Sequence, residues 1–399
     1  MSPKRSNRTL PTMLAIGALG LWSCTGSETH DGGIVDAALD ARDAGGADTG
    51  GVDTGNIDTG GPHDSGGGDV NNVVDSGPTT GGHNLACSGA SFRSDAVFYQ
   101  DITSATLDAQ SDSIMMALDR DGWAPAGARQ NLGIDFSFVI NCAASDLTRT
   151  PLTLNDPSVV DDGSDTAPVP LPPGGAIEGG TGYSCSGGDC HLIVYQGTRL
   201  YEVYQANVNG STLEGGFLAV WDLTHNYWDE TLMGAAYSRG EHCDGGNAGD
   251  LPIGPKLLTA DEIRAALAGD GIIHHALRFT IPNSRIDGNV YCHPATHTGT
   301  VGSPRNPYLP YAARLRLRPD FDLASLPNDA ARVVARTLQH YGMYMEDGGN
   351  IFISATTDAS DVISSADIGS LRPHDFQMVD GGRRILWTDY TCMHTAVTN

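Results

Sequence analysis

The first group of residues suited to chemistry in this chain is a set of histidines between positions 191 and 297. Each can bind a metal or exchange a proton near neutral pH; they are His191, His242, His274, His275, His293 and His297. His293 and His297 have the i,i+4 spacing of helical zinc ligands, but the Pro-Ala-Thr between them lacks a glutamate base and disfavours a helix. A zinc site of this pair with His191 or His242 is one hypothesis, and acid–base, substrate-orienting or purely structural roles are the others.

Two of these histidines are expected to meet at one site. His275 opens HALRFT, an alternating segment that predicts a strand, and His297 lies beyond the next strand signal. A hairpin between the two strands would place both imidazoles at one rim. We therefore predict that His275 and His297 line one polar cleft, where one places a ligand and the other exchanges a proton. Two unrelated structural histidines are the alternative.

Three carboxylates supply a second candidate group. Glu178 precedes two glycines that let a ligand approach, Glu202 lies in a tyrosine-rich segment, and Asp222 follows an indole. Glycosidases place two carboxylic acids about the scissile bond, and aromatic rings pack on sugars. With Trp221 and Tyr201 as the aromatic surfaces, these acids predict a carbohydrate cleft. The alternative is that the same residues fill the core of a β-rich protein.

Arginines form a third group, suited to anionic ligands. Arg314, Arg316 and Arg318 alternate with leucines, so a strand there would have one apolar and one cationic face. In so acidic a chain these cations either pair with its own carboxylates or meet an acidic sugar. With Arg278, Arg314 and Arg316 as substrate-binding residues and a histidine or tyrosine base, lyase chemistry on a uronate becomes an option beside hydrolysis.

The segment GADTGGVDTGNIDTGG, residues 46–61, contains the Asp-Thr-Gly triplet of aspartic proteases three times. Such an active site needs two carboxyls in apolar loops, whereas Asp48, Asp53 and Asp58 stand among Gly, Thr and single aliphatic residues. This composition cannot bury enough surface to offset the entropy of folding. We predict a disordered linker over residues 25–84, with weak calcium binding as the alternative.

The N-terminus has the features of an export signal. Basic residues precede a short apolar run over 10–22, and Leu-Trp-Ser-Cys at 21–24 is similar to the lipobox of bacterial lipoproteins. This predicts a signal peptide over 1–24, lipidation of Cys24 and a lipid anchor as the only membrane contact, at the cell surface or periplasmic face. A plain secretory signal is the alternative. The net charge of −25 argues against a nucleic-acid partner, and no cofactor is expected.

Seven further cysteines are odd in number. They are Cys87, Cys142, Cys185, Cys190, Cys243, Cys292 and Cys392. Export to an oxidising compartment would pair most of them. Cys185 and Cys190 bracket the short flexible segment Ser-Gly-Gly-Asp, which predicts a disulfide between them. One cysteine then stays free or bonds outside the chain.

Residues 85–399 are predicted to form one mainly β domain. Short aromatic and β-branched segments bounded by turn residues predict strands at 134–140, 191–195, 200–208, 217–223, 275–281 and 313–317. Helices are predicted at 111–118, from the Thr-Ala-Asp-Glu capping box at Thr259, and after Pro327 until Gly342. Strands clustered around a few helices favour an antiparallel β-sandwich or jelly-roll-like core with peripheral helices.

Several short motifs together resemble an uncharacterised family of secreted microbial proteins. In chain order they are IEGG (177–180), LYE (200–202), HALRFT (275–280), PATH (294–297), RLRL (314–317) and YGM (341–343). The resemblance covers residues 98–354 and implies export, but it brings no activity with it. Where the family pattern has an acid before Ala-Ala-Gly-Leu-Pro, this chain has Asn-Ala-Gly-Asp-Leu-Pro at 247–252, so no role passes to Asp250.

Three functions are compatible with these residues. The first is an enzyme acting on extracellular polysaccharide, a hydrolase or a lyase. Its candidate catalytic residues are His191, His275, His297, Glu178, Glu202 and Asp222. The second is a non-catalytic surface module that binds glycan or a partner protein through the same residues. The third is a metal-dependent hydrolase centred on His293 and His297.

Overall fold

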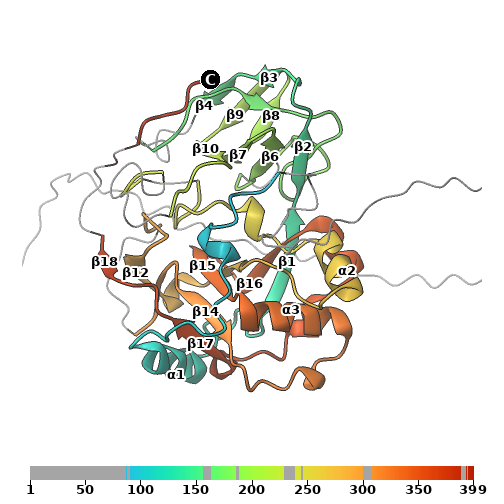
Figure 1. Ribbon diagram of the computed structural model, residues 1–399. Helices are drawn as coiled ribbons and strands as arrows, with labels where there is room; N and C mark the ends of the chain where they lie inside the picture. The colour runs from blue at the N-terminus through green and yellow to red at the C-terminus, as the bar shows by residue number, and fades with distance from the viewer. Residues whose placement is uncertain are drawn as a thin grey trace, which may run out of the picture. The chain divides into compact units, whose positions relative to one another are not determined.

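The structure is a computed structural model (Figure 1) that describes residues 87, 90–155, 163–185, 188–228, 239–243, 246–299, 307–387, 392 and 394–399. All of these residues belong to the unit formed by residues 74–399. The predicted signal peptide, the linker and Cys24 lie outside the described residues, so these assignments and their boundaries stay predictions.

The largest sheet of the described residues has six strands and mixes parallel with antiparallel pairs. Its order is β1-β16-β11-β15-β14-β17. The strands are β1 (Gly133–Phe138), β11 (Leu277–Ile281), β14 (Arg314–Leu317), β15 (Met343–Gly348), β16 (Phe352–Thr356) and β17 (Phe376–Val379). β1 runs parallel to β16 and β11 runs parallel to β15, whereas β14 is antiparallel to β15 and β17. The inner strands are largely buried, as expected for strands covered on both faces.

A second sheet in the described part of the chain has four strands in the order β10-β7-β6-β2. The strands are β2 (Ile140–Ala143), β6 (Leu192–Gln196), β7 (Arg199–Tyr204) and β10 (Phe217–Asp222). β6 is parallel to β2 and antiparallel to β7. Every residue of β6 is buried, which agrees with the continuous apolar run in its sequence.

Smaller sheets complete the β structure. β3 (Arg149–Thr150) pairs with β5 (Val169–Pro170), and β9 (Thr212–Gly215) lies between β4 (Leu152–Leu154) and β8 (Asn207–Asn209). β12 (Ile286–Cys292) lies between β13 (Leu309–Tyr311) and β18 (Arg384–Leu386).

Three of the α-helices in the described residues occur where the sequence predicts them, and a short fourth helix was not predicted. The helices are α1 (Ser111–Asp121), α2 (Ala260–Ala268), α3 (Asp329–His340) and the short α4 (Ser365–Ile368). Thr259 caps α2 by accepting the N–H of Glu262 at 3.2 Å, as the capping box predicts. Gly342 follows α3 with a φ of 67°, a conformation that glycine adopts without strain. Single 3₁₀ turns are η1 (Val97–Tyr99), η2 (Gly254–Lys256), η3 (Asn283–Arg285), η4 (Leu323–Ser325), η5 (Thr357–Asp361) and η6 (Pro373–Asp375).

The fold is therefore a mixed α/β structure with several small mixed sheets, and the described residues show no β-sandwich or jelly roll. The strand positions were largely right, but the expectation of antiparallel pairing needs correction. Parallel pairs join β1 to β16, β11 to β15 and β2 to β6. The composition of a short apolar strand does not show whether its neighbours run parallel or antiparallel to it. That direction depends on partner strands far away in the sequence.

Three disulfides join described cysteines. The predicted Cys185–Cys190 bond is confirmed, and Cys87–Cys142 and Cys243–Cys392 accompany it. Cys292 is the free cysteine of the described residues and is buried on β12. Several disulfides in one chain indicate an extracellular or otherwise oxidising compartment. A search of the described residues found no helix with the length and apolar character needed to cross a membrane.

Candidate functional site

The acid and aromatic residues predicted to form a carbohydrate cleft lie mostly inside the protein. Glu202 on β7 is 2% exposed, and its Oε1 accepts the backbone N–H groups of Ile253 and Gly254, each at 2.8 Å. Its Oε2 accepts the indole N–H of Trp221 at 3.1 Å. Trp221 and Tyr201 are fully buried, so neither ring offers a face to a sugar. Glu202 is held in place as a structural carboxylate.

Asp222, the third predicted acid, lies exposed at the end of β10. Its Oδ1 accepts the backbone N–H of Thr224 at 2.9 Å and the hydroxyl of the same residue at 2.7 Å. Aspartate commonly closes a turn in this way. The side chain therefore has a local structural role, although its neighbour Trp221 on the strand reaches Glu202.

Arg314 and Arg316 on β14 do not form the free cationic face that the alternating pattern predicted. Arg314 donates to the carbonyl oxygens of Val97 at 3.1 Å and Gln100 at 2.8 Å. Arg316 donates to the carbonyl oxygen of Thr103 at 2.9 Å. Both arginines are 7% exposed. They pin the segment 97–103 onto the sheet through its backbone carbonyls, and Arg316 also donates to Gln377 Oε1 at 3.2 Å.

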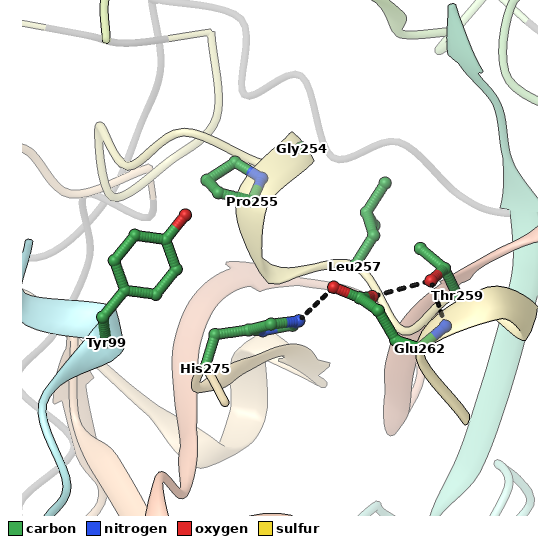
Figure 2. Close-up of a pocket in the computed structure, with 7 residues that line it drawn as sticks. All are labelled: Tyr99, Gly254, Pro255, Leu257, Thr259, Glu262 and His275. Atoms are coloured by element: carbon green, nitrogen blue, oxygen red, sulfur yellow. Dashed lines mark hydrogen bonds and ion pairs between the residues drawn. The ribbon is translucent and has the colours of Figure 1, made fainter. Parts of the chain in front are cut away.

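His275 lines a small hollow next to β11 (Figure 2). Its Nε2 lies 3.3 Å from Glu262 Oε1, and Glu262 Oε2 accepts the hydroxyl of Thr259 at 2.7 Å. The hollow has no room for a sphere the size of a water molecule, whereas ordinary ligand sites enclose roughly 300–1,000 Å³. Although burial acts to lower the pKa of His275, its contacts with Glu262 raise it. The contact between His275 and Glu262 ties α2 to the segment that leads into β11.

His297 lies in a different environment. Its Nδ1 is 3.2 Å from the carbonyl oxygen of Ala248, and its ring packs edge-on against Trp387 with the centroids 4.6 Å apart. His297 is not among the residues that line the hollow beside His275. β11 and β12 lie in different sheets, so the hairpin predicted between them is wrong. The strand signals were correct, but β11 pairs with β15 and β16 instead.

The remaining histidines of the predicted zinc site contact protein groups. His293 Nε2 lies 3.2 Å from Glu241 Oε2, and the ring of His242 packs 5.1 Å from that of Trp387. Across the described residues, no group of three or more His, Cys, Asp or Glu side chains is arranged to hold a metal ion.

Glu178 and His191 do converge, and they form the centre of the candidate site. His191 Nδ1 lies 2.7 Å from Glu178 Oε2, which also accepts the His191 backbone N–H at 3.1 Å. Ser137 on β1 donates its hydroxyl to Glu178 Oε1 at 3.0 Å. His191 Nε2 lies 3.3 Å from the carbonyl oxygen of Gly246. Three side chains thus meet here: the Ser137 hydroxyl from β1, the Glu178 carboxylate from the loop before β6, and the His191 imidazole from the residue directly before β6.

The Glu-Gly-Gly turn at 178–180 places the Glu178 carboxylate beside its partners. The Glu178 N–H donates to the His191 carbonyl oxygen at 2.9 Å, and the Gly179 N–H donates to the Ser137 carbonyl oxygen at 2.8 Å. Gly179 has a φ of 65°, which a residue with a side chain would adopt only with strain. The glycine therefore lets the backbone reverse at this point and direct Glu178 toward both partners.

A second carboxyl, Asp135, shares Ser137 with Glu178. Asp135 Oδ1 accepts the Ser137 backbone N–H at 3.0 Å, while the Ser137 hydroxyl is bonded to Glu178. Burial raises the pKa of Asp135, and the negative charge of Glu178 raises it further. For Glu178, burial acts in the same direction, but the charge and hydrogen bonds of His191 lower its pKa below the usual value. The two neighbouring carboxyls are thus shifted in opposite directions.

Two oxygen acceptors favour the protonated form of His191. Burial acts to lower its pKa, but its hydrogen bond and charge attraction to Glu178 raise it. Its ring packs between Phe138 and Tyr204, with centroids 6.0 and 5.2 Å away. Both ring nitrogens face oxygen acceptors, and an imidazole can donate from both only when both carry protons. His191 therefore favours the ionised form of Glu178.

Arg278 and Asp347 border the same group. Arg278 on β11 donates to Ser354 Oγ at 2.7 Å, and its Nη2 lies 3.5 Å from Asp347 Oδ2. Asp347 interacts electrostatically with His191, and burial raises the pKa of this carboxyl. The Asp347 side chain is 30% exposed, against 4% for Arg278. The candidate site is therefore more exposed to solvent at Asp347 than at Arg278.

Comparisons with protein-family models, curated proteins and solved structures gave no match for this chain. The resemblance to secreted microbial proteins therefore stays a prediction. The site brings together two neighbouring carboxyls and a hydroxyl, which are half-buried, and the buried imidazole of His191 at the start of β6.

The sequence predicted Glu178, His191 and Arg278 as site residues, but Ser137, Asp135 and Asp347 were missed. A signal was present in the segment IDFSF, where Asp135 and Ser137 alternate with apolar residues and so share one strand face. Asp347 sits in Met-Glu-Asp-Gly-Gly, where a strand end carries two acids. Polar residues on one face of an otherwise apolar strand therefore indicate a candidate site as well as histidines do.

A buried ion cluster lies behind the site. Lys256 Nζ is 3.3 Å from Glu346 Oε1, Arg278 Nε is 3.6 Å from Glu346 Oε2, and Lys256 also donates to the carbonyl oxygen of Pro252. Lys256 and Glu346 are both 0% exposed. Burial raises the pKa of Glu346 to about 7 despite the two cations. Because Arg278 contacts both Glu346 and Asp347, it links this cluster to the candidate site.

Proposed function

We propose that this chain is an exported enzyme that hydrolyses glycosidic bonds in extracellular polysaccharide, with Glu178 and Asp135 as its acid pair. One observation carries the proposal: two half-buried carboxyls are bonded to the same serine and have pKa values shifted in opposite directions. Glycosidases use such a pair, one carboxyl protonated and one ionised at the working pH.

The contacts assign a role to each group. Glu178, kept ionised by His191 and Ser137, serves as the nucleophile or base. Asp135, whose pKa is raised by burial and by Glu178, serves as the proton donor to the leaving oxygen. His191 is a positioning residue, because its ring holds the Glu178 carboxylate between two fixed partners.

Hydrolysis fits the site better than β-elimination. A lyase needs an unprotonated base and a cation free to neutralise a uronate carboxylate. Here both nitrogens of His191 face acceptors, and Arg278 is 3% exposed and paired with Glu346 and Asp347. Neither group is available for the lyase roles.

Replacing either carboxyl should abolish most of the activity. In Glu178→Gln and Asp135→Asn we expect reducing-end release from a panel of neutral and acidic polysaccharides to fall by about 10²-fold or more. His191→Gln should lower kcat by less and shift the acidic limb of the pH profile, because Glu178 loses its cation. Asp320→Asn is the matched control: Asp320 is an exposed carboxylate paired with Arg318, and the variant should retain activity.

Two results would contradict this assignment. One is Glu178→Gln and Asp135→Asn variants that fold and turn over polysaccharide at the wild-type rate. The other is a wild-type protein that binds polysaccharides of the panel and releases no reducing ends.

The second outcome would favour the alternative, a non-catalytic surface module that binds glycan or a partner protein. The aromatic residues predicted to contact sugar are buried and the hollow beside His275 is smaller than an ordinary ligand site, which argues against a deep catalytic cleft and equally against sugar stacking on those rings. Pull-down on immobilised polysaccharide, measured together with product release, separates the two functions.

Anchoring at the membrane can be tested separately. If Cys24 carries the lipid, Cys24→Ser should abolish incorporation of labelled fatty acid and move the protein from the membrane fraction to the soluble fraction, because a lipid is then no longer attached to the chain. Wild-type protein processed in parallel is the reference. Membrane association that persists without label would point to a plain secretory signal or another anchor.

A further inference from the structure

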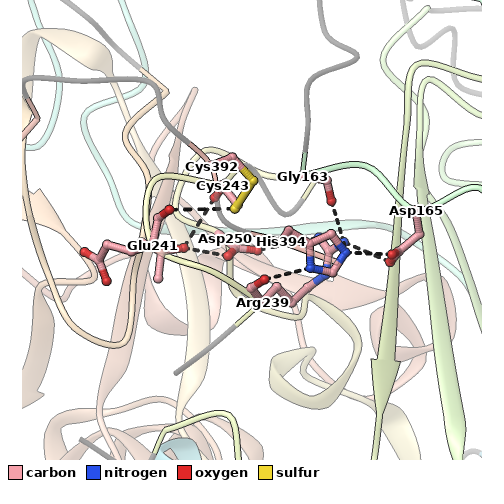
Figure 3. The surroundings of a disulfide bond; sticks show 9 residues. Gly163, Asp165, Arg239, Glu241, Cys243, Asp250, Cys392 and His394 are labelled. Atoms are coloured by element: carbon pink, nitrogen blue, oxygen red, sulfur yellow. Dashed lines mark hydrogen bonds and ion pairs between the residues drawn. A yellow bond between two sulfur atoms is a disulfide. The ribbon is translucent and has the colours of Figure 1, made fainter. Parts of the chain in front are cut away.

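The C-terminal segment 394–399 is held against the edge of the four-stranded sheet by a covalent bond and a buried polar group (Figure 3). Cys392 is bonded to Cys243, 149 residues earlier in the chain. Just beyond it, His394 Nε2 lies 2.7 Å from Asp165 Oδ1, and His394 Nδ1 lies 2.7 Å from the carbonyl oxygen of Arg239. The two attachments are close together in the sequence and fix the start of the segment.

The carboxylate of Asp165 contacts this segment through His394 and Val397. It is 0% exposed, and its Oδ2 accepts the N–H of Val220 on edge strand β10 at 2.7 Å. Its Oδ1 accepts the N–H of Val397 at 2.7 Å, and the Thr166 N–H donates to the Val397 carbonyl oxygen at 2.9 Å. One carboxylate therefore joins the edge strand to the C-terminal segment.

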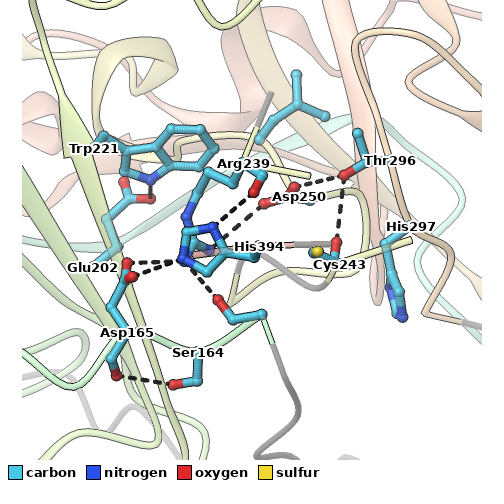
Figure 4. Close-up of polar contacts among 12 residues, drawn as sticks. Ser164, Asp165, Glu202, Trp221, Arg239, Cys243, Asp250, Thr296, His297 and His394 are labelled. Atoms are coloured by element: carbon cyan, nitrogen blue, oxygen red, sulfur yellow. Dashed lines mark hydrogen bonds and ion pairs between the residues drawn. The ribbon is translucent and has the colours of Figure 1, made fainter. Parts of the chain in front are cut away.

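The same group connects to the loop that carries the PATH motif. Figure 4 shows Arg239 beside Asp165 and His394, with Asp250 and Thr296 on its other side. Arg239 donates to Asp165 Oδ2 at 2.8 Å and approaches Asp250 Oδ1 at 3.9 Å. Thr296 donates to Asp250 Oδ2 at 2.5 Å and lies 3.3 Å from the Cys243 carbonyl oxygen. The disulfide and the segment thus brace one continuous polar network.

The segment has little apolar surface to hold it in place. Residues 395, 396, 398 and 399 are exposed, and Val397 is partly buried against an apolar cluster that includes Leu218 and Val220 of β10. A few hydrogen bonds return less free energy than the ordering of a chain end costs, unless another constraint shortens the free chain. The Cys243–Cys392 bond supplies that constraint at the residue where the segment begins.

We propose that Cys243, Cys392 and His394 form a redox latch, so that the C-terminal segment closes on Asp165 only after the two thiols are oxidised following export. Closing transfers two electrons from the thiols to the disulfide of an exported thiol oxidant. The Cys243–Cys392 bond forms, the oxidant's S–S bond breaks, and both thiol protons end on the oxidant's two sulfurs. Reduction by a dithiol reverses the exchange and releases the segment.

Hydrogen exchange of the folded full chain tests the latch. In Cys243→Ser/Cys392→Ser, amide exchange in 394–399 should rise at least about tenfold, while β6 and β7 keep their protection. Cys185→Ser/Cys190→Ser is the matched control and should leave 394–399 protected. His394→Ala, with the disulfide intact, should raise exchange in 394–399 by a smaller factor, because the polar half of the latch is lost.

If the double variant does not fold, the oxidised wild-type chain is treated with dithiothreitol, which also reduces Cys87–Cys142 and Cys185–Cys190, and the order in which regions lose protection is followed. Loss of protection in 394–399 ahead of β6 and β7 supports the latch. Full protection of 394–399 without the disulfide would overturn it, since the hydrogen bonds would then suffice alone. Simultaneous loss of protection in all three regions would also overturn it, because the bond would be a staple of the whole fold.

Discussion

Lys256→Met should lower the free energy of unfolding by about 3–5 kcal/mol, because the buried carboxylate of Glu346 keeps only the more distant Arg278 as a cation. Lys256 and Glu346 are both 0% exposed, and the Lys256 ammonium lies 3.3 Å from Glu346 Oε1. Glu202 interacts electrostatically with the same ammonium. The loss should be largest at pH 8 and smaller at pH 5, where Glu346, with a pKa near 7, takes up a proton and relieves the uncompensated charge.

Denaturant unfolding followed by tryptophan fluorescence measures this change. Adding Glu346→Gln to Lys256→Met should recover a large part of the loss, since replacing both partners removes the unpaired charge. Arg264→Met is the surface control: its partner Asp261 is exposed, and the pair should contribute less than about 1 kcal/mol. If Lys256→Met costs no more than Arg264→Met, the buried cluster does not have the energetic role assigned to it.

Local structure was readable from the sequence, whereas the arrangement of the strands was not. The strands at Leu192–Gln196 and Phe217–Asp222 have aromatic and β-branched runs, and the helix at Ala260–Ala268 has its capping box, so each is marked by residues close together in the chain. The partner of a strand is chosen by contacts between distant segments. Leu277–Ile281 pairs with Met343–Gly348 in parallel, and nothing in either segment specifies that choice.

The candidate site was predicted in part for a similar reason. Glu178 and Glu202 are the same residue type in similarly promising contexts, but they meet different environments. Glu202 accepts N–H groups of residues about fifty positions away and is fully enclosed, while Glu178 is half-buried beside His191. The difference lies in which distant backbone covers each side chain, and residue type carries no information about that.

The arginine pattern shows how a correct strand can suggest the wrong function. Arg314 and Arg316 do alternate with leucines on one strand, as predicted. The face they occupy is covered by the segment that contains Val97 and Thr103, so their guanidinium groups bond backbone carbonyls. A guanidinium on a free face and one under a covering segment look alike in the sequence.

Glu346 should make the protein less stable as pH rises from about 4.5 to about 7. In the unfolded chain this carboxyl loses its proton near its ordinary pKa of 4.5, whereas in the folded protein burial raises the pKa to about 7. Between these values the unfolded chain releases a proton that the folded chain retains, so rising pH favours unfolding. At about 1.4 kcal/mol per pKa unit, the full effect is about 3 kcal/mol.

Other groups titrate in the same window, so the prediction concerns the difference between wild type and Glu346→Gln. The charged groups that face Glu346 are Lys256, Arg278 and Glu202, all retained in the variant. His191 and His275, with raised pKa values, also stabilise less as pH rises through those values, but they do so in both proteins. Unfolding free energies measured from pH 4 to 8 should therefore show the wild-type curve falling relative to Glu346→Gln by about 3 kcal/mol. Glu214→Gln on β9 is the matched control and should give a curve parallel to wild type. Parallel curves for wild type and Glu346→Gln would mean that Glu346 is ionised throughout, fully compensated by Lys256 and Arg278.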